Sequence, residues 1–400
     1  MYMTKLSSIA DYVTDKISSN DIALREYVTT DCILQNKKGR EIATNLPPQS
    51  CCLTRYQRGD VLIANIRPYL KKVWFADIDG GASSDVLVFR AKEGHSPSFL
   101  YAVLLQDSFF DYVMQGAKGS KMPRGDKEQI LRYEMPTLSC SEESIGTFFL
   151  NLDQKIRLDE QINQNLETMA KQLYDYWFVQ FDFPNEEGKL YKSSGGEMLW
   201  NDKLKRNIPV GWHCGNLFEI AVFTNGLACQ KFRPKDDEVP LPVIKIREMH
   251  DGISVDTEEV TSNIPESVKV YNGDVLFSWS ASLEVMLWAY GLGGLNQHIF
   301  KVTSANDFPK SFYYFQLLDY VDVFKKMAEA RKTTMGHITQ DHLQQSTIAI
   351  PDNKDIADKF EELISPIFKQ IVKLQEEISN FIKQRDELLP LLMNGQITIE

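Results

Sequence analysis

The sequence has few cysteines, no long apolar run and no signal-like start. Six cysteines without a C-x-x-C pair are too few for a disulfide scaffold, which predicts a reducing, cytoplasmic location. No run approaches the ~18 apolar residues that span a bilayer. Polar residues recur throughout Met1–Asp11, so we expect neither export nor a membrane partner.

Motifs for common chemistries are also missing. There is no G-x-x-x-x-G-K-[ST], H-E-x-x-H or G-x-S-x-G sequence. Gly291–Gly294 reads G-L-G-G, which lacks the spacing of a dinucleotide-binding loop. Of the six scattered histidines, His337 and His342 are five apart and would point to different sides of a helix. We therefore expect no catalytic residue, metal site or bound cofactor in this chain.

Charge and size suit a soluble protein of more than one domain. The chain has 400 residues, is 43% hydrophobic and 25% charged, and carries a net charge of −11, which predicts two or three globular domains. The acidic balance argues against nonspecific coating of nucleic acid. Local basic loops could still bind DNA, because charges act mainly within a Debye length of ~8 Å.

The chain repeats itself at an offset of 211–214 residues. Y-Q-R-G-D-V-L at 56–62 parallels V-Y-N-G-D-V-L-F at 270–277, and K-L-S-S-I-A at 5–10 parallels N-L-F-E-I-A at 216–221. Farther on, G-S-K-M-P-R parallels K-T-T-M-G-H. Similarities in one order at nearly one offset predict two copies of a unit, each a globular part followed by a long helix.

Short β-rich runs beside helical segments predict an α+β fold with two mixed α/β globular domains. The two long helices would separate these domains, and a pseudo-two-fold axis would relate the repeats. The predicted boundaries are 1–140 for the first globular domain, 141–183 for the first long helix, 184–212 for a linker, 213–351 for the second globular domain and 352–400 for the second long helix.

Both helical stretches carry a seam in which steps of four and three residues alternate. The seam positions are Leu152, Ile156, Asp159, Asn163, Leu166, Ala170, Leu173 and Trp177, and then Ile367, Ile371, Leu374, Ile378, Phe381, Arg385 and Leu388. This period favours an antiparallel intramolecular coiled coil over two helices packed separately on their own domains. Pro366 fits the first turn of the second helix and Pro390 its end near Leu389.

Both copies become basic at the same place, at 116–127 in the first and at 325–337 in the second. Two further loops, 66–72 and 230–235, add cations. Lys and Arg can neutralise phosphates, whereas Ser, Thr and Arg can reach base edges; the alternative is ordinary solvated surface charge. The candidate DNA-binding residues are Arg67, Lys71, Lys72, Lys118, Ser120, Lys121, Arg124, Lys231, Arg233, Arg331, Lys332, Thr333 and Thr334.

The run between the two halves carries a resemblance to a known family. W-F-V-Q-F-D-F-P at 177–184, Y-K-S-S-G-G at 191–196 and I-P-V-G-W at 208–212 resemble the central linker of specificity subunits of type I restriction–modification enzymes. The order of domains and helices matches that family along nearly the whole chain. The globular domains match only in outline, which is expected where the target sequence differs.

The resemblance implies a noncatalytic subunit with two target recognition domains, each of which would read one half of a bipartite, asymmetric site in double-stranded DNA. The helices would set the gap and dock two modification (methyltransferase) subunits. Restriction (translocase–nuclease) subunits would complete the complex. S-adenosylmethionine, ATP and Mg are then expected in those partner subunits, and none in this chain.

Two hypotheses of other classes remain open. A duplicated scaffold that binds proteins would show no salt-dependent affinity for DNA, even with partner subunits present. A stand-alone nuclease or methyltransferase would need activity from the purified chain, and the missing motifs disfavour it.

Overall fold

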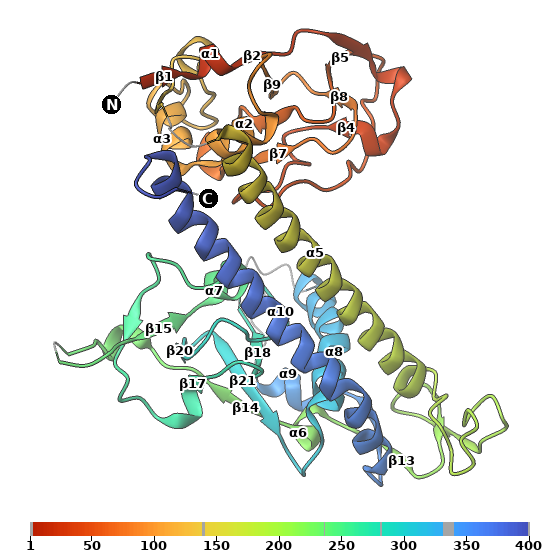
Figure 1. Ribbon diagram of the computed structural model, residues 1–400. Coiled ribbons are helices and arrows are strands. Elements are labelled where there is room, and N and C mark those ends of the chain that lie inside the picture. The colour runs from red at the N-terminus through yellow and green to blue at the C-terminus, as the bar shows by residue number, and fades with distance from the viewer. Residues whose placement is uncertain (1–2, 138–140, 236, 281, 331–339, 399–400) are drawn as a thin grey trace. The chain divides into compact units, whose positions relative to one another are not determined.

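The computed structural model describes residues 3–137, 141–235, 237–280, 282–330 and 340–398 (Figure 1). Its contacts divide the chain into two compact units. Unit 1 comprises Met1–Leu158 with Asn380–Glu400, and unit 2 comprises Asp159–Ser379. The long helices α5 (Glu142–Tyr174) and α10 (Asp355–Met393) each contribute one part to either unit.

Unit 1 is built from short strands and helices before α5. These are β1 Met3–Lys5, α1 Leu6–Ile9, β2 Ala10–Tyr12, β3 Lys16–Ser18, β4 Tyr27–Val28, β5 Cys52–Tyr56, β6 Val61–Ala64, β7 Val73–Phe75, β8 Gly80–Ala82, β9 Val86–Ala91, α2 Pro97–Leu105, α3 Asp107–Gln115, α4 Lys127–Ile130 and β10 Glu134–Pro136. They form two four-stranded sheets, β2-β9-β6-β7 and β3-β5-β8-β4, and the pair β1-β10.

The main core of unit 1 lies between the first sheet and its helices. Residues of α2 are buried along nearly the whole helix, and α5 packs directly on that helix. Gly146 of α5 makes this close approach possible, because a Cβ there would stand 2.3 Å from the backbone nitrogen of Phe99. A larger residue at this position would push the two helices apart.

Unit 2 contains the corresponding elements between the two long helices. These are β11 Met198–Asn201, β12 Arg206–Pro209, β13 Trp212–Gly215, α6 Leu217–Ile220, β14 Ala221–Asn225, β15 Leu241–Ile244, α7 Ile246–Asp251, β16 Glu259–Val260, β17 Lys269–Val270, β18 Val275–Ser278, β19 Glu284–Leu287, β20 Gly293–Leu295, β21 Ile299–Ser304, α8 Lys310–Ala330, α9 Gln340–Gln344 and β22 Ile348–Pro351.

The sheets of the two units repeat one plan. In unit 2 the order β14-β21-β18-β19 follows that of β2-β9-β6-β7, and the pair β13-β22 follows β1-β10. A short helix directly precedes β2 in unit 1 and β14 in unit 2. This shared order supports the internal repeat and makes the fold mixed α/β, as the sequence predicted.

The second sheets differ at one edge. In unit 1, β8 pairs with β4 in parallel and with β5 antiparallel, and in unit 2, β20 does the same with β15 and β17. The fourth strand then joins opposite sides, because β3 pairs with β5 whereas β16 pairs with β15. The repeat therefore preserves three strands of this sheet and changes the outermost one.

Within unit 1, the N-terminal part of α5 contacts the C-terminal part of α10. Arg385 Nη1 lies 3.7 Å from Asp153 Oδ1, and the Lys155 ammonium lies 5.8 Å from the centre of the Phe381 ring. The two contacts advance along α5 while they step back along α10, so these segments run antiparallel.

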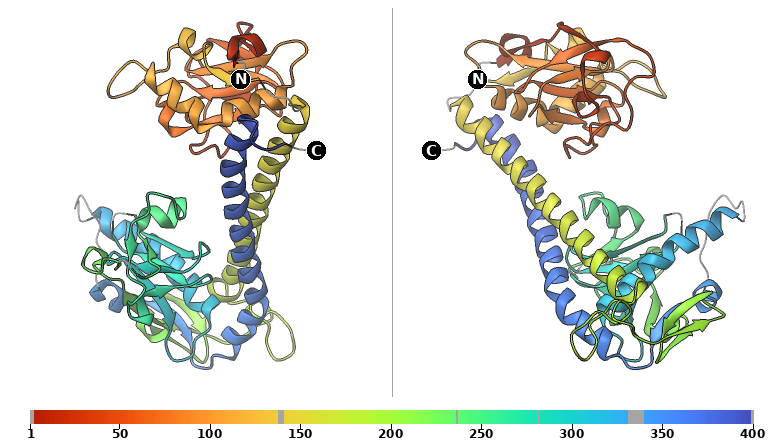
Figure 2. Two further views of the ribbon diagram at one scale, coloured as in Figure 1. Left: turned by 60° about the vertical axis from the view of Figure 1, so that its left-hand side comes forward. Right: turned by 90° about the vertical axis from the view of Figure 1, so that its right-hand side faces the viewer.

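Unit 2 shows the same direction of packing (Figure 2). Asn163 Nδ2 donates to Gln375 Oε1 at 3.5 Å, and the Tyr174 ring meets Phe360 at 6.1 Å between centres. Most predicted seam positions are buried or partly buried. The helix-to-helix contacts within each unit are therefore observed, whereas the coiled coil as a spacer between recognition domains stays a prediction.

Two expectations about prolines in the second helix are wrong. The helix begins eleven residues before Pro366, at Asp355, whose N–H donates to Asn353 Oδ1 at 3.0 Å. Pro366 is exposed, so water can solvate the carbonyl that loses its donor. At the other end, α10 continues past Pro390 to Met393, because Leu392 and Met393 are buried in the core of unit 1.

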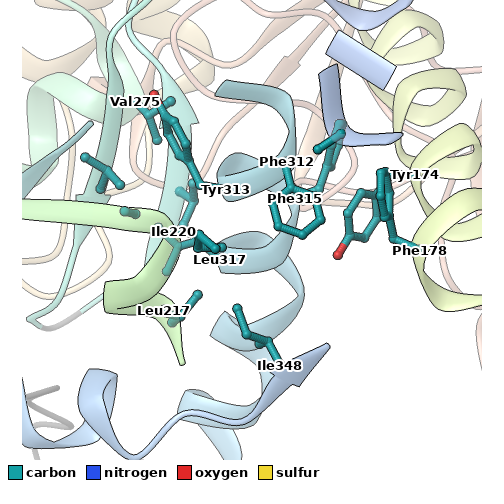
Figure 3. Close-up of a cluster of buried hydrophobic side chains, with 14 of the residues drawn as sticks. Tyr174, Phe178, Leu217, Ile220, Val275, Phe312, Tyr313, Phe315, Leu317 and Ile348 are labelled. Carbon is teal, nitrogen blue, oxygen red and sulfur yellow. The ribbon is translucent and has the colours of Figure 1, made fainter. Parts of the chain in front are cut away.

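The aromatic residues at the end of α5 form part of the core of unit 2. A π-turn at Asp175–Val179 follows α5, and Tyr174 and Phe178 point toward Phe312 and Phe315 of α8 (Figure 3). The Tyr174 ring stacks on Phe315 at 5.1 Å, and Phe178 meets Phe312 at 5.0 Å. This end of the helix is thus anchored on α8.

A histidine on β13 makes the stability of unit 2 depend on pH. His213 Nδ1 lies 2.6 Å from Asp352 and Nε2 lies 3.2 Å from Glu219. Burial opposes the charged imidazolium, but these two carboxylates outweigh it and raise the pKa of His213. The raised pKa stabilises the fold fully below the unfolded value of ~6.5, and this gain is lost as pH rises through the folded-state pKa.

We therefore expect His213→Gln to be less stable than the wild type at pH 6, and the difference to shrink toward pH 9. The effect should stay below about 1 kcal/mol, because the imidazole is half exposed. Urea unfolding at both pH values measures it. A difference that grows with pH would contradict the assignment, and His342→Gln serves as a control substitution.

Among the described residues, no helix combines the length and apolar character needed to cross a bilayer.

Candidate DNA interface

The basic loop of unit 1 is a small hairpin between α3 and α4. Lys118 and Arg124 exchange backbone hydrogen bonds of 2.9 and 3.0 Å, and Gly119 turns the chain with φ of +98°. Asp126 then caps α4 by accepting from the backbone N–H of Glu128 and of Gln129. The loop is held at both ends, so its cations are presented from an ordered backbone.

The fold brings the 66–72 loop against this hairpin. Arg67 N donates to Pro123 O at 2.8 Å, and Ile66 forms a β-bridge with Arg124. The two loops, whose closest predicted cations Lys72 and Lys118 are 46 residues apart in sequence, therefore share one surface. We call it the unit 1 basic surface, and its exposed predicted members are Arg67, Lys118, Ser120, Lys121 and Arg124.

Two side chains of this surface were not predicted from the sequence. Tyr69 and Met122 are both 50% exposed, and they lie in the same two loops as the cations. An exposed aromatic ring or thioether beside cations can contact sugars or base faces. The loop sequence P-Y-L at 68–70 contains the tyrosine, but the sequence does not show whether its side chain is exposed or packed inward.

The cations of the unit 1 basic surface are not equally free to bind a ligand. Lys118 Nζ lies 2.9 Å from Asp126, and this hydrogen bond raises the pKa of Lys118 and lowers that of Asp126. Arg124 lies 3.2 Å from Asp85. In the part of the chain that the structure describes, neither Lys121 nor Arg67 makes an ion pair, so these two are the cations most available to a phosphate.

Lys71 and Lys72 are already bonded within unit 1. Lys71 Nζ lies 3.0 Å from Asp107, and Lys72 Nζ donates to Thr30 O at 2.6 Å. Their predicted DNA contacts stay predictions, and each contact would have to replace a bond that now orders the loop.

A buried lysine fixes the position of the 66–72 loop. Lys37 is 5% exposed and lies 2.8 Å from Asp107 and 3.2 Å from Asp386 of α10. Burial favours the neutral form of the Asp107 carboxyl, but hydrogen bonds from Lys37 and Lys71 outweigh burial and hold the pKa of Asp107 below its usual value. The backbone N–H of Lys37 also donates to Lys71 O at 3.0 Å. This network ties the loop to α3 and α10.

The 66–72 loop and the segment around Lys37 contain non-glycine residues with left-handed backbone. Asn36 and Lys37 have φ of +58° and +62°, and Arg67 and Lys71 have φ of +53° and +50°. Such backbone costs energy for residues with a Cβ and persists only where surrounding contacts impose it. The lysine network supplies those contacts, so the structure holds Arg67 at a defined place instead of leaving it on a free loop.

Unit 2 presents fewer of its predicted residues. Lys231 and Arg233 are exposed in the segment after β14, where a short 3₁₀ turn at Cys229–Lys231 follows the strand. Arg331, Lys332, Thr333 and Thr334 lie outside the described residues.

Among the residues that are described, no cluster of His, Cys, Asp or Glu could hold a metal ion.

These features define a class of protein: a duplicated α/β chain whose two halves share one strand order, with a basic two-loop surface on the first. Residues 209–387 match the family model described as type I restriction modification DNA specificity domain.

Relatives resemble the chain over nearly its whole length. The type I restriction enzyme MjaIX specificity subunit of Methanocaldococcus jannaschii is 23% identical over 398 residues, covering 96% of this chain and 87% of that protein. The HindI specificity subunit of Haemophilus influenzae is 22% identical and covers 98% of each. The crystal structure of the S subunit of the type I restriction–modification system of M. genitalium matches with a TM-score of 0.61 at 12% identity, covering 98% of this chain and 96% of that one.

The chain therefore has the fold of a type I S subunit, and its residues 209–387 are similar to the type I restriction modification DNA specificity domain. The resemblance found in the central linker is confirmed.

Proposed function

We propose that this chain is the noncatalytic specificity subunit of a type I restriction–modification complex. Each unit would read one half of a bipartite, asymmetric site in double-stranded DNA, and the paired long helices would set the gap between the halves. The observation that carries the proposal is the repeat: two units of one strand order, of which unit 1 gathers the cations of two separate loops on one surface.

An exposed face of α5 supports docking of partner subunits. Leu158, Ile162 and Met169 are 52%, 37% and 43% exposed, and steps of four and seven residues place them on one side of the helix. An apolar helix stripe of this kind fits the helices of another chain. We infer that two modification subunits dock on the long helices, that restriction subunits join them, and that S-adenosylmethionine, ATP and Mg belong to those partners.

Methylation mapping tests the proposal directly. The gene, expressed with its modification subunit in a cell that otherwise lacks the system, should add methylated adenine at one split motif, and deletion of the gene should remove it. If no split motif changes and the assembled complex shows no salt-dependent DNA affinity, the protein-interaction scaffold becomes the better reading.

Loss of three cations from the unit 1 basic surface should weaken DNA binding by the assembled complex. Lys118→Ala, Lys121→Ala and Arg124→Ala together should reduce the slope of log affinity against log salt by up to about three, since each phosphate contact contributes ~0.9. The reduction should fall short of three where Asp126 and Asp85 compete for Lys118 and Arg124.

Titration at several salt concentrations measures this slope. The matched control removes three exposed cations elsewhere in unit 1, with Lys5→Ala, Arg25→Ala and Arg58→Ala, and should leave the slope nearly unchanged. Equal slopes for both triple variants would place the hairpin outside the DNA interface.

A further inference from the structure

The unit 1 basic surface lies at one end of β9 and β6, the central strands of the sheet β2-β9-β6-β7. Asn65, directly after β6, donates its N–H to the carbonyl of Asp85, directly before β9, at 2.8 Å. The hairpin closes on this point, because Gly125 N donates to Asn65 O at 3.3 Å and Arg124 pairs with Asp85. The predicted ligand surface of unit 1 thus begins where β6 ends and β9 starts.

The repeat marks the equivalent point in unit 2. Trp279, directly after β18, donates its N–H to the carbonyl of His298, directly before β21, at 3.3 Å. Asn225 ends β14, the strand that pairs with β21 on the other side. Three neighbouring strands therefore bring Asn225, Trp279, Gln297 and His298 to one end of this sheet. Asn225 is exposed, and the other three are partly buried.

These four side chains contact one another in pairs. Trp279 Nε1 donates to Asn225 Oδ1 at 3.3 Å, and the Trp279 ring lies 5.6 Å from the imidazole of His298. Gln297 Nε2 lies 3.3 Å from His298 Nε2. Buried His298 Nδ1 has no hydrogen-bond partner within the described residues. The indole N–H uses one lone pair of Asn225 Oδ1 and so holds the amide in place. The second lone pair of Oδ1 and the Nδ2 donors remain for a ligand.

The basic segment of unit 2 starts beside this cluster. Leu227 N donates to Leu295 O at 2.8 Å, and Gln297 N donates to Leu227 O at 2.8 Å. These bonds tie the beginning of the segment that carries Lys231 and Arg233 to the turn that carries Gln297 and His298. Lys231 and Arg233, which can bind phosphates, therefore lie only a few residues along the chain from uncharged groups that can read bases.

We propose that Asn225 and Gln297, with Trp279 as the residue that positions Asn225 and His298 as the residue that positions Gln297, form the base-reading site of unit 2. The inference rests on the proposed function and names the part of unit 2 that carries it out. Amide side chains offer a donor and an acceptor together, which matches the edge of adenine in the major groove. Uncharged groups neutralise no phosphate, so they add nothing to the salt dependence of binding. The ligand class is the edge of a base pair, with A·T favoured.

The experiment uses the complex assembled with its modification subunits and a DNA library in which each half of the methylated motif is randomised in turn. Gln297→Ala and Asn225→Ala should each reduce discrimination at positions of one half-site by about tenfold, the loss expected for one bidentate base contact. The other half-site and the salt slope should stay as in the wild type. Asn263→Ala, a loss of another exposed amide in unit 2, should leave both halves unchanged.

The possible outcomes distinguish failure of the base-reading site from failure of the proposed function. If the wild-type complex methylates a split motif but both variants keep full discrimination, the base-reading site is refuted and the proposed function stands. If the variants relax both half-sites equally, a general loss of structure is the cause and the site is again refuted. If the wild type marks no split motif, the proposed function fails and the site fails with it. Gln297→Met, which keeps the side chain's size, replaces Gln297→Ala if that variant does not assemble.

Discussion

Inserting one heptad into α5 after Leu158 and another into α10 after Ser379 should lengthen the gap of the methylated DNA motif by about three base pairs. Seven helical residues add ~10.5 Å at 1.5 Å per residue, and each base pair of B-DNA spans ~3.4 Å. The helix segments run antiparallel within unit 1 and within unit 2, so matched insertions would keep the pairing in both. The motif's two half-sites should not change, because no recognition loop is altered.

Single insertions provide the control for this result. A heptad added to α5 alone leaves α10 too short to pair on both sides of it, and we expect altered spacing or loss of methylation. The readout in every case is the methylated motif mapped across a genome. An unaltered gap in the doubly extended protein would show that something other than the helices sets the distance between the half-sites.

Asp153→Ala should lower the free energy of unfolding by about 3–5 kcal/mol, the range expected when one member of a buried ion pair is removed. The Asp153 and Arg385 side chains are 3% and 4% exposed. Asp153 also accepts from Tyr101 Oη at 2.9 Å and from Arg157 Nη2 at 2.6 Å. Its loss therefore leaves a buried hydroxyl and two guanidinium groups without this carboxylate, and Asp386 alone remains close to Arg385 at 3.0 Å.

Urea or guanidinium unfolding followed by circular dichroism measures this loss. The matched control is Glu387→Ala on α10, whose pair with Lys383 at 3.9 Å is well exposed; its removal should cost less than about 1 kcal/mol. Asp153→Asn should fall between the two, since it keeps an acceptor for Tyr101 but removes the charge. Similar costs for Asp153→Ala and Glu387→Ala would mean that water reaches the buried pair.

Much of the fold follows from patterns that the sequence carries in plain form. The G-D-V-L repeat predicted equivalent strands, and β6 and β18 each begin at the valine of this motif. The seam predicted which faces of α5 and α10 are buried, including polar Asn163 and Arg385. The errors fall at Pro366 and Pro390, where a local rule about proline met a helix stabilised by packing along its length.

Only part of the candidate site could be predicted from the sequence. Charge density identified the hairpin around Lys121, but it also selected Lys71 and Lys72, whose ammonium groups turn inward to Asp107 and Thr30. Asn225, Trp279 and Gln297 carry no charge and stand in separate stretches of sequence. No local sequence pattern marks these residues as neighbours, so composition and spacing could not identify them as one site.

The sequence by itself determined the duplication, the positions of the long helices and the family resemblance, because each depends on repeats, periodicity or motifs that are local along the chain. Only the tertiary structure decided which cations are free, how Lys37 fixes the 66–72 loop and which uncharged side chains meet at the strand ends of unit 2. These properties depend on contacts between residues far apart in sequence, and sheet pairing and burial set those contacts.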